Sequence, residues 1–138
     1  MPTVKEVEAK LRSERRRAGE RGVVVYVAGP YTPYGADTHG SPRLTYINVK
    51  RAIHVGLAVL KLGFYPVIPH LSYFVHLEAP EDFGTFYYEW DNELLKRCDV
   101  FLKYDLSRGA DAEEELAKSL GLPIFHSVEE LATYEPKG

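Results

Sequence analysis

The stretch VVVYVAG, residues 23–29, decides how the chain is expected to fold. It is an unbroken apolar run of mostly β-branched residues that ends in glycine, which is typical of a central strand buried on both faces of a parallel sheet. Three later segments also favour short strands: FYPVIP (64–69), DVFLKY (99–104) and LPIF (122–125). A segment with helical character separates each strand from the next, so strand and helix alternate along the chain.

The first of these helical segments, TYINVKRAIHVGLAVLKLG (45–63), has apolar or small residues at the spacing of one helix face, and Gly63 is placed as its C-terminal cap. We expect the buried face to consist of Val49, Ala52, Ile53, Gly56, Leu57 and Leu60. A second helix is predicted within TFYYEWDNELLKRC (85–98). A third follows residue 107 and ends at Gly121, with Ala112, Leu116 and Leu120 on its inner face.

With right-handed crossovers, this order predicts a small doubly wound parallel sheet, Rossmann-like or flavodoxin-like, with four to five strands and helices on both faces. Such sheets bind ligands beyond the carboxyl ends of their strands, at the point where the strand order reverses. A loop of about 14 residues, 31–44, follows the first strand, and loops of this length in compact domains are often functional.

The length of 138 residues suits one compact domain, which we expect at 22–138 after an N-terminal helical arm at 1–21. The arm has Val4, Val7 and Leu11 at helical spacing and a basic run at 15–17, and we interpret it as a solvated or subunit-packing helix. The formal net charge of −3 argues against a nucleic-acid partner. A lone Cys98, no signal-peptide pattern and no long apolar run predict a cytoplasmic protein without a membrane partner.

The segment SRGADAEEELAKSLGLP (107–123) is the most informative for function. It leaves the predicted third strand and begins a helix, so its main-chain N–H groups and the helix dipole favour an anion there. Ser107 either caps the helix or donates its hydroxyl to a phosphate, and Arg108 either clamps a phosphate or faces solvent. Gly109, followed by Ala110, permits close approach of a ligand to the backbone.

The three consecutive glutamates of this segment point in different directions, because each helical step rotates by about 100°. Glu114 lies four residues before Lys118, where an exposed ion pair is expected, and Glu115 is expected to be solvated. Glu113 borders the buried face, one turn before the small Ala117. The ionised carboxylate that the first turn of a helix favours is what a nucleophile attacking a sugar carbon requires.

Over residues 23–125 the chain resembles the nucleoside 2-deoxyribosyltransferase-like superfamily, including its nucleoside 5′-monophosphate N-glycosidase relatives. The marks of the resemblance are VYVAGPYT, Asn48, GFYPVIP, EWDNELLKRCDVFL and, as the most specific, SRGADAEEELAKSLGLP. It implies that Glu113 is the nucleophile that attacks C1′ and forms a glycosyl-enzyme intermediate. It also implies that Asp91, at the start of the helix before the third strand, assists departure of the base. Cleavage with retention needs one carboxylate beneath C1′ and a proton source for the base, as in retaining glycosidases.

The resemblance further implies that Tyr26 helps to position the nucleophile and that Gly29, Pro30 and Tyr31 line the sugar pocket. True deoxyribosyltransferases carry an aspartate six residues before the nucleophile, whereas this chain has Ser107, as the monophosphate hydrolases do. We therefore expect a nucleoside 5′-monophosphate substrate with water as the acceptor, in preference to base exchange. The long loop 31–44 departs from the short turn of the characterised enzymes. Relatives complete the pocket from a neighbouring subunit, which implies a homodimer or a higher homo-oligomer.

An aromatic-rich stretch could wall a pocket against which a base stacks, although core packing explains most of its rings. It comprises Tyr73, Phe74, Phe83, Phe86, Tyr87, Tyr88 and Trp90. His70, at the carboxyl end of the second strand, is either a contact to base or phosphate or half of a metal pair with His76. No carboxylate or cysteine completes a ligand set, so neither a metal nor another cofactor is expected. Cys98 is interpreted as a small apolar filler.

Two alternatives remain open on the residues alone. A non-catalytic nucleotide-binding or sensing module of the same fold would bind without turnover, and its binding would not depend on the Glu113 carboxylate. Nucleic-acid binding through the arginine-rich arm would show a steep salt dependence and would be lost on deletion of residues 1–21.

Overall fold

The computed structural model describes residues 1–10, 21–31, 42–79 and 86–136. Their core is a sheet of four parallel strands, β1 (Val24–Ala28), β2 (Tyr65–Val67), β3 (Val100–Lys103) and β4 (Ile124–Phe125). The strand order is β2-β1-β3-β4, so β1 is central and the order reverses between β1 and β3. Tyr26, in the middle of β1, is level with Val67 on one side and Phe101 on the other. The predicted α/β fold with a parallel sheet is confirmed.

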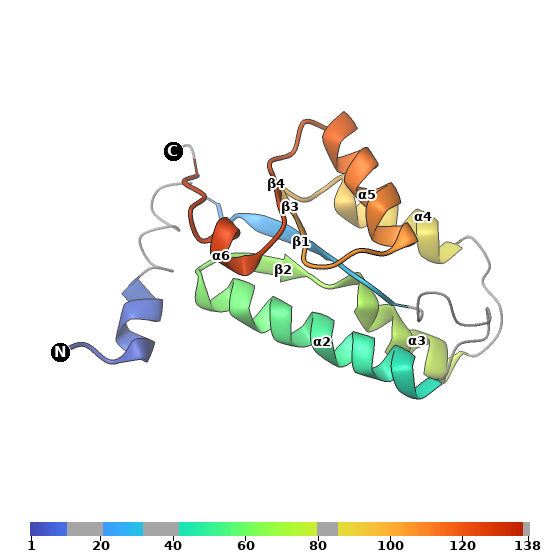
Figure 1. Ribbon diagram of the computed structural model, residues 1–138, viewed down its shortest axis with the longest axis horizontal. Helices are drawn as coiled ribbons and strands as arrows, with labels where there is room; N and C mark the ends of the chain where they lie inside the picture. Colours follow the sequence, from blue (N-terminus) through green and yellow to red (C-terminus); the bar gives the residue numbers. More distant parts are fainter. Residues whose placement is uncertain (11–20, 32–41, 80–85, 137–138) are drawn as a thin grey trace.

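Helices cover both faces of this sheet, as predicted (Figure 1). They are α2 (Pro42–Lys61), a 3-10 turn at Pro69–Leu71, α3 (Ser72–Glu78), α4 (Phe86–Leu95), α5 (Arg108–Ser119) and α6 (Val128–Leu131). Residues 4–10 form a separate helical segment, and the rest of the predicted arm, including its basic run, lies outside the described residues. Residues 32–41 of the long loop lie outside them too.

The alternation of side chains along β1 and β3 divides the core in two. Val25 and Val27 of β1 pack with Val59 of α2 and Leu131 of α6 on one face. Tyr26 and Ala28 point to the opposite face, where they join side chains from α4 and α5: Leu95, Ala110 and Ala117. Since all four β1 residues from Val25 to Ala28 have no exposed surface, the central strand is buried on both sides, as its sequence predicts.

The helices differ from their predicted faces in identifiable ways. In α2, Val49, Ala52 and Gly56 are buried as expected, but Leu57 and Leu60 are 50% and 38% exposed. Their places toward the sheet are taken by Val55 and Val59, one step around the helix. The left-handed φ angles of Gly63 (93°) and Gly121 (73°) confirm both predicted helix ends.

The face of α5 is also corrected. Ala110 and Ala117 are its buried residues, whereas Ala112 is exposed and Leu120, the C-cap, is 42% exposed. Leu116, the third predicted position, is partly buried and packs against the core as expected. The small side chains of Ala110 and Ala117 allow the helix axis to approach the sheet on this face. Neither α3 nor α6 was predicted, because both are short and lack a clear apolar period.

This close approach makes a first testable prediction. Ala117→Leu adds the three heavy atoms of an isopropyl group against the sheet and should lower the free energy of unfolding by about 1–3 kcal/mol through overpacking. The control Ala112→Leu, on the exposed side of the same helix, should change it by less than about 0.5 kcal/mol. Urea denaturation followed by circular dichroism measures both. Equal effects of the two substitutions would show that α5 does not pack tightly through Ala117.

Candidate active site

Three side chains from three elements meet on the α4–α5 face of the sheet. The hydroxyl of Tyr26, from the central strand, donates a hydrogen bond to Oε2 of Glu113, in the second turn of α5. Asp91 of α4 is close enough to both groups to act on them electrostatically. Tyr26 has no exposed surface and stacks on Phe101 of β3, with ring centroids 5.9 Å apart. Glu113 therefore contacts a fully buried side chain of the central strand.

Burial sets the protonation of this acidic pair. It raises the pKa of Asp91 to about 7. It is also the largest cause that raises the pKa of Glu113 to about 7, followed by the hydrogen bond from Tyr26, which lowers it, and the charge of Asp91, which raises it. Two interacting carboxyl groups that both titrate near neutrality hold about one proton between them at that pH. Such a pair can supply one carboxylate and one carboxylic acid at the same time.

Asp91 lies in the middle of α4, five residues after Phe86, and not at the start of a helix as the sequence interpretation has it. The helix begins earlier because Phe86 to Trp90 continue the helical pattern toward the N-terminus. Asp91 is therefore too far from the N-terminus of α4 for the helix dipole to explain an acidic residue at this position. Its position on the side of α4 that faces β1 and α5 brings it to the site.

The segment before Glu113 forms the N-terminus of α5. Ser107 is the N-cap: its Oγ accepts a hydrogen bond from the main-chain N–H of Ala110 at 3.0 Å. This is the capping alternative of the two expected for Ser107, whose hydroxyl hydrogen is still available for donation. Arg108 and Gly109 are exposed, and the space that a Cβ on Gly109 would occupy is open to beyond 4 Å.

The turn after β1 is held from two sides. Nε2 of the buried His70 lies 3.0 Å from the carbonyl oxygen of Gly29 and 3.1 Å from that of Pro30. Burial lowers the pKa of His70, so the neutral ring donates Nε2–H to these carbonyls. A Cβ on Gly29 would lie 2.1 Å from the ring of Tyr104, which explains the glycine. His70, with 4% of its surface exposed, holds this turn, and its expected contact to a base or phosphate stays a prediction.

Aromatic side chains gather next to Asp91. Burial is the main cause that raises the pKa of Tyr31 to about 12, and the hydroxyls of Tyr73 and Tyr87 and the carboxylate of Asp91 add to it. The ring of Tyr87 also stacks on Trp90, at 6.4 Å between centroids. Of the two adjacent tyrosines in this stretch, Tyr87 is partly buried and Tyr88 is 68% exposed. Phe83 lies outside the described residues.

Some contacts near the site had no role assigned from the sequence. Asn48, a mark of the resemblance, lies inside α2, and its Nδ2 donates to the carbonyl oxygen of Tyr31 at 3.0 Å. Arg51 pairs with Asp105 at 2.6 Å and lies over the Tyr104 ring at 5.1 Å. The one signal in the sequence for these contacts is that Asn48 and Arg51 are polar residues within the mostly apolar helical segment 45–63. These contacts connect α2 to the loops that follow β1 and β3.

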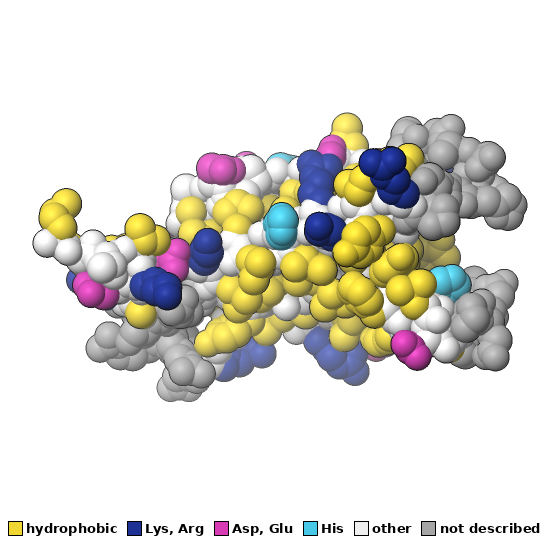
Figure 2. All heavy atoms as spheres, turned by 90° about the horizontal axis from the view of Figure 1, so that it is seen from below, with side chains coloured by type: hydrophobic (Ala, Val, Ile, Leu, Met, Phe, Trp, Pro, Cys, Tyr) yellow, Lys and Arg dark blue, Asp and Glu magenta, His cyan; other side chains and the backbone are white. Residues whose placement is uncertain are grey.

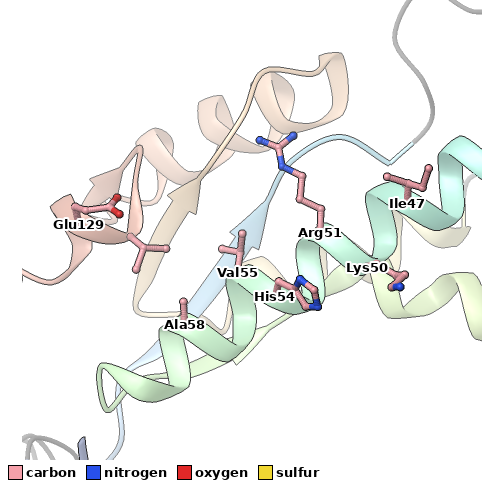
Figure 3. Close-up of a pocket in the computed structure, with 8 residues that line it drawn as sticks. Ile47, Lys50, Arg51, His54, Val55, Ala58 and Glu129 are labelled. Atoms are coloured by element: carbon pink, nitrogen blue, oxygen red, sulfur yellow. The ribbon is translucent and has the colours of Figure 1, made fainter. Parts of the chain in front are cut away.

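A separate open groove of about 630 Å³ lies on the other side of the sheet, between α2 and α6 (Figure 3). Its lining residues are Ile47, Lys50, Arg51, His54, Val55, Ala58, Val128 and Glu129. Neither Glu113 nor Asp91 lines it, and its walls carry no pair of buried acids. The acidic pair and this groove are therefore separate features of the molecule.

Cys98 is buried, and its thiol donates to the carbonyl oxygen of Leu94. Burial raises the pKa of this thiol to about 12, as expected of a packing residue and not of a nucleophile. Within the described ranges, no three side chains of the His, Cys, Asp and Glu types gather as a metal site would require. In the same part of the chain, no helix has both the length and the apolar character needed to cross a bilayer.

Comparison with protein-family models, curated proteins and solved structures finds no significant match to the chain. Together, the fold and the site define a small α/β protein with a parallel sheet and a partly buried acidic pair on the α4–α5 face of that sheet.

The raised pKa of Glu113 predicts a pH-dependent cost in stability. Between the usual value of 4.5 and about 7, the folded state holds a proton that the unfolded state releases, so stability falls as pH rises through this window. Glu113→Gln removes the loss and should raise the free energy of unfolding at pH 8 by on the order of 2 kcal/mol, with little gain at pH 4. Glu115→Gln, whose native side chain is 74% exposed, is the matched control. Urea denaturation at both pH values measures the difference; an equal gain at pH 4 and pH 8 would contradict it.

Proposed function

We propose that this chain cleaves the N-glycosidic bond of a nucleoside or a nucleoside 5′-monophosphate, with Glu113 as nucleophile and Asp91 as the acid that assists the departing base. One observation carries the proposal: Tyr26 holds Glu113 near a second partly buried carboxyl group, that of Asp91, and the pKa of each is raised to about 7. Retaining glycosidases use one ionised and one protonated carboxyl group, and two carboxyl groups that share about one proton near neutral pH can supply both.

The reaction follows from this arrangement in two steps. Tyr26 engages Oε2 of Glu113, and we assign the attack on C1′ to Oε1. As the Oε1–C1′ bond forms, the C1′–N bond breaks, its electron pair goes to the base, and the proton of Asp91 neutralises the base. A water molecule then attacks C1′ of the glycosyl ester, returns its proton to Asp91 and releases the sugar and the Glu113 carboxylate. No cofactor enters these steps.

A phosphate on the 5′ position would suit the N-terminus of α5. The positive end of the helix dipole, the exposed Gly109 with open space around it, and the exposed Arg108 support this subsite. The hydroxyl hydrogen of Ser107 is a further donor. The turn of Gly29, Pro30 and Tyr31 would line the sugar on the opposite side of the crevice, with Tyr73 and Tyr87 near the base.

The proposal predicts release of free base. Wild type, Glu113→Gln, Asp91→Asn and the control Glu115→Gln are each incubated with ribo- and deoxyribonucleosides and their 5′-monophosphates, and the base is measured by chromatography. We expect no base from Glu113→Gln, a rate lowered by about 10²- to 10⁴-fold in Asp91→Asn, and the wild-type rate in the control. Because Glu113 must be ionised and Asp91 protonated, kcat/KM should peak near pH 7 and fall on both sides.

Two results would contradict the proposal. One is base release by Glu113→Gln at the wild-type rate. The other is the absence of turnover in wild type while a nucleotide raises the melting temperature of wild type and of Glu113→Gln alike, which would establish a binding module instead.

We also propose that the protein forms a homo-oligomer through α2 and α3. Figure 2 shows hydrophobic side chains gathered over the side of the molecule on which these helices lie. Their exposed large apolar residues are Leu44, Tyr46, Ile47, Leu57, Leu60, Phe74, Val75 and Leu77. Contiguous apolar surface of this kind marks an interaction site more often than free surface.

Light scattering after size exclusion tests this surface. Wild type should have a mass at least twice that of one chain, and Leu57→Arg should lower it, because a charge would then be buried in the contact. The control Leu120→Arg changes a residue of similar exposure on α5, on the opposite side of the sheet, and should leave the mass unchanged. A monomeric wild type would contradict the proposal.

A further inference from the structure

A group of charged side chains joins the end of β3 to the side of α5. Nζ of Lys103, the last residue of β3, lies 3.0 Å from Oδ1 of Asp111 and 3.1 Å from Oε2 of Glu114. The lysine side chain is 10% exposed and that of Glu114 is 13% exposed. The expected exposed pair of Glu114 with Lys118 is thus a minor contact of 3.6 Å on a carboxylate that is turned inward.

Glu114 is held from a third direction as well. Nε2 of His126, the residue after β4, lies 3.0 Å from Oε2 of Glu114. These contacts lower the pKa of Glu114, with His126 as the largest cause and Lys103 among the others. Glu113 and Glu114 are adjacent in the chain, yet the pKa of the first is raised and that of the second is lowered.

Because three consecutive residues of α5 are glutamates, the sequence of the helix alone does not determine which of them faces Tyr26. A rotation by one residue, about 100°, would bring Glu114 toward Tyr26 in place of Glu113. The small Ala110 and Ala117 permit close packing but offer little shape to resist such a rotation. A buried ammonium resists it strongly, because leaving Lys103 without its carboxylates would be costly.

We propose that Lys103 is a positioning residue of the site: by holding Asp111 and Glu114 at the end of β3, it fixes the rotation of α5 so that Glu113 points at Tyr26. Its role in turnover rests on the function proposed for Glu113, whereas its role in placing the Glu113 carboxylate does not. Lys103 acts through the helix, since the groups that shift the pKa of Glu113 are Tyr26 and Asp91, together with burial.

The test follows the Glu113 carboxyl by NMR titration of protein labelled with ¹³C at the glutamate carboxyl groups, with Glu113→Gln to assign its signal. In wild type it should titrate near pH 7. In Lys103→Met the carboxyl should leave its buried place, so its midpoint should fall toward the usual 4.5, because burial is the largest cause of the rise. Lys103→Arg should restore the wild-type midpoint. The control Lys118→Met removes the other lysine next to Glu114. The Lys118 side chain is 54% exposed, so its loss should leave the Glu113 midpoint unchanged.

The rate of base release gives the second readout. Lys103→Met should lower kcat by about 10- to 100-fold per folded molecule, with KM unchanged, because misplacement of a reacting group by about 1 Å has this effect. Circular dichroism establishes whether Lys103→Met folds. If it does not, Glu114→Gln serves in its place, because it keeps the lysine and removes one of its two carboxylates. Glu114→Gln should also lower the Glu113 midpoint. An unchanged Glu113 midpoint in the folded variants would overturn the inference. A wild type that releases no base would overturn the proposed function, while the titration still decides the role of Lys103.

Discussion

One hydrogen bond, from the Tyr26 hydroxyl to the Glu113 carboxylate, joins the central strand to α5, and the surrounding structure is arranged to permit it. Tyr26 can reach the helix only because Ala110 and Ala117 bring α5 close to the sheet. The tyrosine is itself immobilised by burial and by the stack on Phe101. The Glu113 carboxylate is therefore held by a side chain that is itself packed on all sides, which is the kind of support that pre-organised sites have.

Within α5, neighbouring residues of the same type meet opposite environments. Glu113 lies in a poorly solvated place near another acid, while Glu114 is surrounded by Lys103, His126 and Lys118. The desolvation of Glu113 lowers the stability of the folded protein. The charge of Glu114 is compensated by its cationic neighbours. An acid whose desolvation is only partly compensated, here by the hydrogen bond from Tyr26, lowers stability at neutral pH, and strongly perturbed acids of this kind are enriched at functional sites.

The sequence was sufficient for the parts of this structure that depend on local pattern. The β-branched run of β1 predicted a doubly buried strand, and the position of Glu113 relative to Ala117 predicted its inward direction. It was insufficient where the outcome depends on which distant side chain arrives. Lys103 lies at the end of an apolar strand, and nothing in the neighbouring sequence indicates its partners Asp111 and Glu114. The buried face of α5 was misjudged because Ala110 and Ala112 are the same residue type, and only the packing of the helix on the sheet decides which of them is buried.

The contact between Gly29 and Tyr104 has a consequence for how such a chain can diverge. The tyrosine ring fills the place of any side chain at position 29, so the turn after β1 and the loop after β3 are shaped against each other. The two strands are neighbours in the sheet but some 75 residues apart in the chain. At their carboxyl ends, the space next to the sheet can hold the Tyr104 ring or a side chain at position 29, but not both. Homologues that gain a side chain at the first position are expected to carry a smaller residue at the second, so the two sites should covary.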